Sequence, residues 1–271
     1  DRLSDEDWAR VLMHEDADPI VTAILAMIEP AVLASRADTL ENLGYDVRYA
    51  IDLSRHPYPM SQTIHYAAGV LGMEAPPTFQ NVNDDGGISF LHAQHPSIVL
   101  GRAAFEVEVP QQAAAFIVAR HLTYYRPGLY IRHLIPTGTG LKAWLFAAIK
   151  MNSPQFPVSG DLEGPVEANL KALNEFLSGP MKERLASLVS KLLQSGRALD
   201  LKKWVAAVDL TADRAGLLIC HDLEVAIEMI KASDESVSPV SHKDRLKEAV
   251  LFSISENYFG IRSKLGIAVD S

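Results

Sequence analysis

Apolar residues recur every three to four positions along most of the chain, which is the spacing of helices that bury one face. The predicted helices cover residues 5–14, 17–29, 30–42, 59–71, 110–125, 127–134, 139–151, 163–178, 180–194, 199–219, 222–231 and 243–259. Pro30 is expected to bend or divide the second and third of these helices, because proline lacks the amide hydrogen that a helix interior uses.

Between residues 77 and 100 the pattern changes to short apolar or alternating stretches, which are typical of strands. We expect strands at 77–82, 88–92 and 97–100. Residues 83–87 are expected to form a hairpin turn, because Asn, Asp and Gly accept tight-turn conformations. A small antiparallel sheet inserted among so many helices predicts an α+β fold that is predominantly helical.

No linker interrupts this order, and 48% hydrophobic and 22% charged residues among 271 are typical of a globular protein. We therefore predict one domain over residues 1–271. Its parts are a helical lead-in at 1–58, the sheet and the helix around residue 120 at 59–135, and a helical body at 136–271. The chain begins with Asp1 rather than methionine, so we expect a fragment of a longer protein.

The charge and the single cysteine narrow the classes of partner and compartment. A formal net charge of −9 without a cluster of Lys and Arg argues against nucleic acid and anionic membranes as partners. The longest apolar run, residues 19–28, is shorter than the about 20 residues that span a bilayer, so no membrane insertion is expected. Cys220 has no second cysteine to pair with, which fits a reducing, cytoplasmic compartment.

Polar side chains interrupt two of the predicted helices. Arg120 and Tyr124 are four residues apart and share a helix face, with His121 beside them, while Asp209 and Asp213 share a face of a later helix. Two buried carboxylates one turn apart need cationic or hydrogen-bonding partners. We predict that these five residues form a polar cluster or pocket in which Arg120 neutralises Asp209 and Tyr124 adds a hydrogen bond. In the alternative, Arg120 extends to the surface and Asp209 is solvated.

One motif resembles a known family. The segment Asp209-Leu-Thr-Ala-Asp-Arg-Ala-Gly216 is similar to the Glu-x-x-Ala-Asp-Arg segment of HtpX-like zinc metallopeptidases. The segments that begin at His242 and at Ser255 resemble the C-terminal part of a related group of non-catalytic, peptidase-like domains. Those domains lie at the ends of bacterial tetratricopeptide-repeat proteins. The resemblance covers roughly residues 60–266 and implies a zincin-like fold.

The same resemblance implies that the zinc site has been lost. It places Arg120 and Tyr124 on the two histidine positions of a His-Glu-x-x-His helix, His121 on the catalytic glutamate, and Asp209 on the third zinc ligand. Arginine has no lone pair to donate to a metal, and zinc requires three protein donors and an open position for water. We therefore expect no catalytic residue, no metal ligand and no cofactor.

The sequence thus predicts a non-catalytic protein-interaction or scaffold domain of a bacterial cytoplasmic protein, with a protein partner; a homo-oligomer is left open. Two alternatives are retained. One is a metal-dependent peptidase or hydrolase that uses an unorthodox site built from His121, His221 and Asp209. The other is a sensor in which a pocket beside Arg120 captures the carboxylate of a small molecule or peptide.

Overall fold

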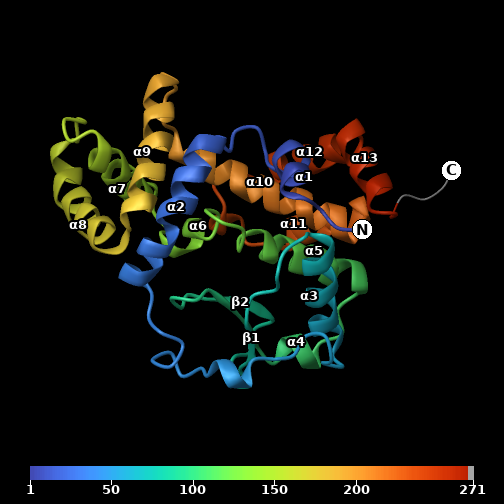
Figure 1. The fold of residues 1–271 in the computed structure, drawn as a ribbon. Helices are drawn as coiled ribbons and strands as arrows, with labels where there is room; N and C mark the ends of the chain where they lie inside the picture. Colours follow the sequence, from blue (N-terminus) through green and yellow to red (C-terminus); the bar gives the residue numbers. More distant parts are fainter. Residues whose placement is uncertain (268–271) are drawn as a thin grey trace.

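In the computed structural model, which describes residues 1–267, most helices form one broad layer, and the small sheet lies below it with the helices Pro59–Val70 and Ala103–Glu106 beside the strands (Figure 1). The helices are α1 (Asp5–Asp7), α2 (Pro19–Arg36), α3 (Pro59–Val70), α4 (Ala103–Glu106), α5 (Gln111–Thr123), α6 (Ile131–Leu134), α7 (Gly138–Asn152), α8 (Gly160–Phe176), α9 (Gly179–Gln194), α10 (Leu201–Cys220), α11 (Leu223–Ala232), α12 (His242–Ser253) and α13 (Glu256–Lys264). A π-helical segment (Trp8–Leu12) and two short 3-10 helices (Val47–Tyr49, Glu235–Val237) complete them. The predicted α+β, predominantly helical class is confirmed.

Within residues 1–267, α5 and α10 make the most extensive contact of any pair of helices. Gly216 allows this approach, because a Cβ atom at that position would lie 2.7 Å from the ring of Phe116. Asp200 caps the start of α10 by accepting the amide of Lys203, and His221 ends the helix in a left-handed conformation with φ 43°. α5 and α10 therefore hold their facing side chains at a fixed register.

Two hydrophobic clusters meet along α10. Residues in its first half pack with α2, α7, α8 and α9, whereas residues in its second half pack with α3, α5, α11, α12 and α13. Figure 1 shows α10 crossing the molecule between these two groups of helices. The middle of α10, which carries Asp209 and Asp213, thus lies at the junction of the two clusters.

The predicted break at Pro30 is wrong, because α2 is one helix that contains Pro30. Ile24, Leu25, Ile28 and Val32 are fully buried on both sides of the proline, and this continuous apolar face outweighs one lost backbone hydrogen bond. Within residues 1–267, α2 alone has the length and apolar composition of a membrane span, and it packs in the first hydrophobic cluster.

Other predicted helix limits also change. Residues 37–42 are not part of a helix, and the segment 243–259 is divided between α12 and α13 by Ser255, which accepts the amide of Tyr258 and begins a new helix. Before α6, residues 127–130 form a loop rather than a helix. Gly128 in that loop has φ 83°, and its missing Cβ lets the loop touch the backbone of α2 at Thr22.

The sheet is mixed rather than antiparallel, which corrects the predicted hairpin. Strands β1 (Thr78–Gln80), β3 (Ser97–Leu100) and β2 (Ile88–Leu91) lie in the order β1-β3-β2, with β3 parallel to β1 and antiparallel to β2. The segment 83–87 binds the chain that follows β3, since the amides of residues 101–103 donate to backbone oxygens at 84, 86 and 87. That anchoring separates β1 from β2 and leaves β3, all of whose residues are buried, in the centre.

Candidate functional site

The five sequence-predicted polar residues lie where α5 faces α10. Arg120 donates from Nε to Oδ1 of Asp213 over 2.8 Å, and the Tyr124 hydroxyl donates to Oδ1 of Asp209, also over 2.8 Å. Asp209 and Asp213 are 1% and 2% exposed. A step of one turn forward along α5 matches a step of one turn back along α10, so the helices are antiparallel and their polar side chains meet in pairs.

Arg120 thus makes its direct ion pair with Asp213 rather than with Asp209, although the charge of Asp209 also acts on Arg120. The predicted hydrogen bond of Tyr124 to Asp209 is confirmed. The antiparallel register brings Arg120 opposite Asp213 and brings Tyr124 opposite Asp209. Asp209 obtains its cation from Arg132 of α6, whose Nη2 lies 3.1 Å from Oδ2. The alternative of a solvated Asp209 is excluded by its burial.

Arg245 of α12 belongs to the cluster although sequence reasoning missed it. Its Nε donates to Oδ2 of Asp213 over 2.7 Å and its Nη2 donates to Oδ1 over 2.8 Å, while Nη1 donates to the Ser233 hydroxyl over 2.7 Å. The side chain is 1% exposed. Its position four residues before Ala249 and seven before Phe252, which are both buried, is the spacing of a core-facing residue. That spacing was the available signal.

Residues before α12 close the cluster from another side. The Ser238 hydroxyl donates to Oδ2 of Asp209 over 2.7 Å, and Arg132 Nη2 also donates to the carbonyl of Val237 over 2.7 Å. Both oxygens of Asp209 are thereby occupied by donors. No pattern in residues 233–238 indicates this role, because it depends on where the loop is carried by α11 and α12.

Two buried histidines lie next to the ion pairs on the side of the sheet. The ring of Phe90 stacks against His121 with centroids 4.0 Å apart and against His133 at 4.2 Å. The two histidine rings cannot both stack on the same face of the Phe90 ring at these distances, so Phe90 lies between His121 and His133. Burial and the adjacent arginine charges lower the pKa of His121 to about 3 and that of His133 to about 2, so both imidazoles are neutral.

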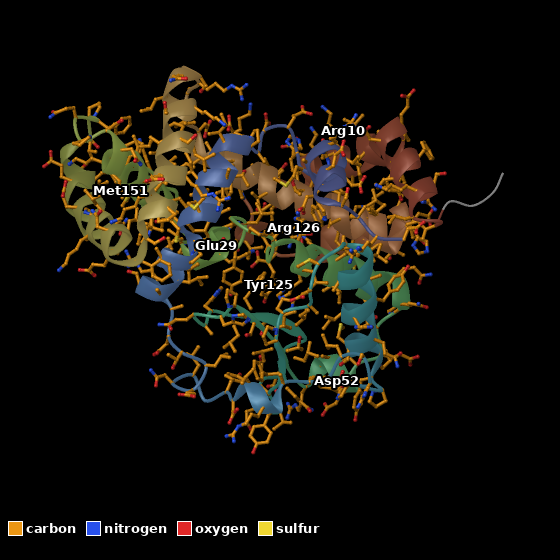
Figure 2. All side chains as sticks on the ribbon, viewed as in Figure 1. Arg10, Glu29, Asp52, Tyr125, Arg126 and Met151 are labelled. Carbon is orange, nitrogen blue, oxygen red and sulfur yellow. The ribbon has the colours of Figure 1, made fainter. Side chains whose placement is uncertain are left out.

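The side of His121 that faces the sheet is fixed by Tyr125, which lies between the helical layer and the strands (Figure 2). The Tyr125 hydroxyl donates to the carbonyl of Ser97 over 2.6 Å and lies 3.4 Å from Nε2 of His121. Because the hydroxyl hydrogen is used on Ser97, we assign the neutral His121 as the Nε2–H tautomer, which donates to the Tyr125 oxygen. Nδ1 of His121 is then an acceptor.

The cluster holds more positive than negative charge. Arg132 neutralises Asp209, and Arg245 neutralises Asp213 through two parallel hydrogen bonds, so Arg120 is a third cation against two carboxylates. The neutral histidines add no charge. Arg120 binds Asp213 through Nε alone, and its two terminal nitrogens have no hydrogen-bond partner in the described part of the chain.

Arg120 faces a pocket of about 210 Å³ enclosed by β2, α5, α11 and α12. Its side chain is 22% exposed, so solvent reaches the guanidinium through this pocket. The polar lining residues come from α5, its C-cap, α12 and the loop after α11, and are Arg120, His121, Tyr124, Arg245 and Ser233. The apolar lining residues are Ile88, Phe90, Phe116, Ile117 and Met229.

The alternative metal site is not assembled in this arrangement. His221 follows Asp209 by twelve residues along α10, which corresponds to about 18 Å. Its Nδ1 lies 3.0 Å from the carbonyl of Ile219. In residues 1–267, no three His, Cys, Asp or Glu side chains are grouped so that they could hold a metal ion.

Comparisons with known proteins add no family: no protein-family model, no curated protein and no solved structure matches the chain. The likeness to HtpX-like metallopeptidases therefore depends on the segment from Asp209 to Gly216 and on the order of the elements, and stays a prediction.

Proposed function

We propose that this chain is a non-catalytic interaction domain that recognises its partner through an anionic group bound at Arg120. The observation that carries the proposal is the uncompensated charge of Arg120 at the pocket wall. A guanidinium with two terminal nitrogens turned to a semi-enclosed pocket is suited to a carboxylate, which accepts two parallel hydrogen bonds from it.

The state of the two aspartates supports the non-catalytic part of the proposal. Asp209 accepts hydrogen bonds from Tyr124, Arg132 and Ser238, and Asp213 is bound by two arginines. A metal-dependent hydrolase needs carboxylate or imidazole lone pairs for the metal and a base for its water. Here the carboxylate lone pairs already serve arginine and hydroxyl donors, and His121 is a weak base because its pKa is about 3.

Two features of the sequence support the nature of the proposed partner. The likeness of residues 60–266 to the peptidase-like domains of tetratricopeptide-repeat proteins supports a protein partner in the bacterial cytoplasm. The net charge of −9 supports a partner other than nucleic acid. The pocket beside Arg120 then provides the point at which a carboxylate of that partner is held.

The proposal is tested by thermal unfolding of the 271-residue chain in sodium acetate, formate and chloride at equal ionic strength. Carboxylates are expected to raise Tm above that in chloride, because a ligand bound only by the native state stabilises it. Arg120→Gln is expected to remove the difference and still fold, since Asp213 keeps both hydrogen bonds from Arg245.

The matched control is Arg214→Gln, which removes the neighbouring arginine of α10 that pairs with Glu248 away from the pocket. This variant is expected to keep the carboxylate effect. Equal Tm in all three salts for the native chain, or an effect that persists in Arg120→Gln, contradicts anion recognition at Arg120.

A further inference from the structure

The pocket beside Arg120 presents three kinds of surface, and each selects a different part of a ligand. The terminal nitrogens of Arg120 have no hydrogen-bond partner in residues 1–267 and are suited to an anion. Nδ1 of His121 has no hydrogen-bond partner among residues 1–267 and, in the Nε2–H tautomer, accepts a hydrogen bond. Phe116, Ile117 and Met229 form an apolar wall. A complementary ligand therefore carries a carboxylate, an N–H group and a compact apolar group.

We infer that this pocket takes the C-terminal residue of a polypeptide with an apolar side chain, which deepens the proposed function and depends on it. Such a residue bears its carboxylate, its amide N–H and its side chain on one Cα atom. The carboxylate binds Arg120, the amide hydrogen is donated to Nδ1 of His121, and the side chain packs on Phe116 and Ile117.

The size of the pocket supports a single residue. Its volume of about 210 Å³ is below the roughly 300–1,000 Å³ of pockets that hold drug-sized ligands. An internal Asp or Glu would need two chain directions to leave this semi-enclosed space, whereas a C-terminal residue leaves it by one. The main chain of the partner then continues outside the pocket, where it adds contacts that the terminal residue alone does not make.

The positive charge around the pocket favours the C-terminal residue of a peptide over a free amino acid. Arg120 and Arg245 both line the pocket, and the cluster around them holds an excess of one positive charge. The ammonium group of a free amino acid is repelled by this charge, while the uncharged amide of a peptide is not. His121 is neutral as well, so it offers an acceptor but no negative charge that attracts an ammonium.

Calorimetric titration of the 271-residue chain with four small probes tests this assignment. N-acetyl-leucine carries all three groups, N-acetyl-leucinamide lacks the carboxylate, leucine carries an ammonium, and acetate lacks the apolar and N–H groups. N-acetyl-leucine is expected to bind at least about tenfold more tightly than each of the others, because the amide loses the charge-assisted hydrogen bonds, leucine brings a repelled ammonium, and acetate loses the apolar contact and the N–H group. A hexapeptide that ends in Ala-Leu with a free C-terminal carboxylate is expected to bind more tightly than N-acetyl-leucine. The same hexapeptide with a C-terminal amide is expected to bind about tenfold more weakly than its free acid.

Two variants place the binding in this pocket. Arg120→Gln is expected to abolish the preference for the free acid over the amide. Ile117→Trp is expected to block all probes by filling the pocket from α5; Ile117 is only partly buried, so its enlargement leaves the core in place. Retained folding of both variants is checked by circular dichroism.

The outcomes separate this inference from the proposed function. Binding of acetate that depends on Arg120, with N-acetyl-leucine no tighter than acetate or leucine, overturns the C-terminal residue and leaves anion recognition standing. Equal affinity of the hexapeptide acid and amide overturns it as well. Absence of binding by every carboxylate probe overturns both.

Discussion

Replacing Glu29 by glutamine tests how burial of the Glu29 carboxyl makes the free energy of unfolding depend on pH. Glu29 contacts α6, the helix that carries Arg132. Glu29 lies on α2 (Figure 2) and accepts the amide of Ile131, at the first turn of α6, over 3.1 Å. Burial raises the pKa of the Glu29 carboxyl from 4.5 to about 7, although backbone amides at Ile131, Gly128 and Tyr130 partly oppose the shift. The folded chain thus holds a proton that the unfolded chain releases.

The sign of the pH dependence follows from proton counting. Between pH 4.5 and 7 the native state binds more protons at Glu29 than the unfolded state does, so stability falls as the pH rises through this window. Each pH unit in the window is worth 1.36 kcal/mol, which makes the contribution about 3 kcal/mol. Below pH 4.5 the contribution is fully present, and above about pH 7 it is lost. Glutamine keeps a carbonyl acceptor for the amide of Ile131 and has no proton to release.

Urea unfolding of the native chain and of Glu29→Gln at pH 5, 6, 7 and 8 measures the effect. The free energy of unfolding of the variant, minus that of the native chain, is expected to rise by about 2–3 kcal/mol across this series. The buried histidines titrate in both proteins and cancel from the difference. Glu175→Gln, on the exposed surface of α8, is the control and is expected to shift stability by less than about 0.5 kcal/mol at every pH. A difference that does not change with pH refutes a buried, elevated carboxyl pKa at Glu29.

Three further predictions concern the site and its helix pair. His121→Phe should resist acid better than the native chain, because His121 takes up a proton below pH 6.5 in the unfolded state but excludes it down to about pH 3 in the folded state. In urea unfolding, the free energy of unfolding of the variant minus that of the native chain should grow by about 2 kcal/mol from pH 6.5 to 4.5. A difference that does not change with pH argues against a buried, neutral His121. Gly216→Ala should lower the free energy of unfolding by about 1–3 kcal/mol, because the added methyl group overpacks the contact with Phe116. Gly260→Ala is the control and should be neutral or stabilising, because its added Cβ meets open space. Equal effects of the two substitutions contradict the close contact of α5 and α10. Asp213→Asn should cost about 3–5 kcal/mol in chemical unfolding because Arg245 loses its anion in a buried position, and a loss below about 1 kcal/mol excludes a buried ion pair there.

Local chemistry made the polar cluster predictable in part. The spacing of four residues places Arg120 with Tyr124 and Asp209 with Asp213 whatever the tertiary structure, because it follows from the helix repeat. The apolar periodicity of α5 and α10 likewise predicts that these faces are buried, and burial of two carboxylates requires cations nearby. The helical class and the need for partners follow from such short-range rules, whereas the bond from Tyr124 to Asp209 depends on the register of the two helices.

Tertiary packing decided which partners meet. The antiparallel register of α5 and α10 assigns Arg120 to Asp213, and Arg245 reaches the same carboxylate from 32 residues further along the chain. The order β1-β3-β2 and the unbroken helix through Pro30 also depend on contacts between distant segments. By itself, the sequence determined the helical class, the amphipathic faces and the five candidate residues on two of the helices, because these follow from periodicities a few residues long. The pairing, the excess charge of Arg120 and the pocket in front of it were decided by the tertiary structure, because they depend on how separate faces dock and exclude water.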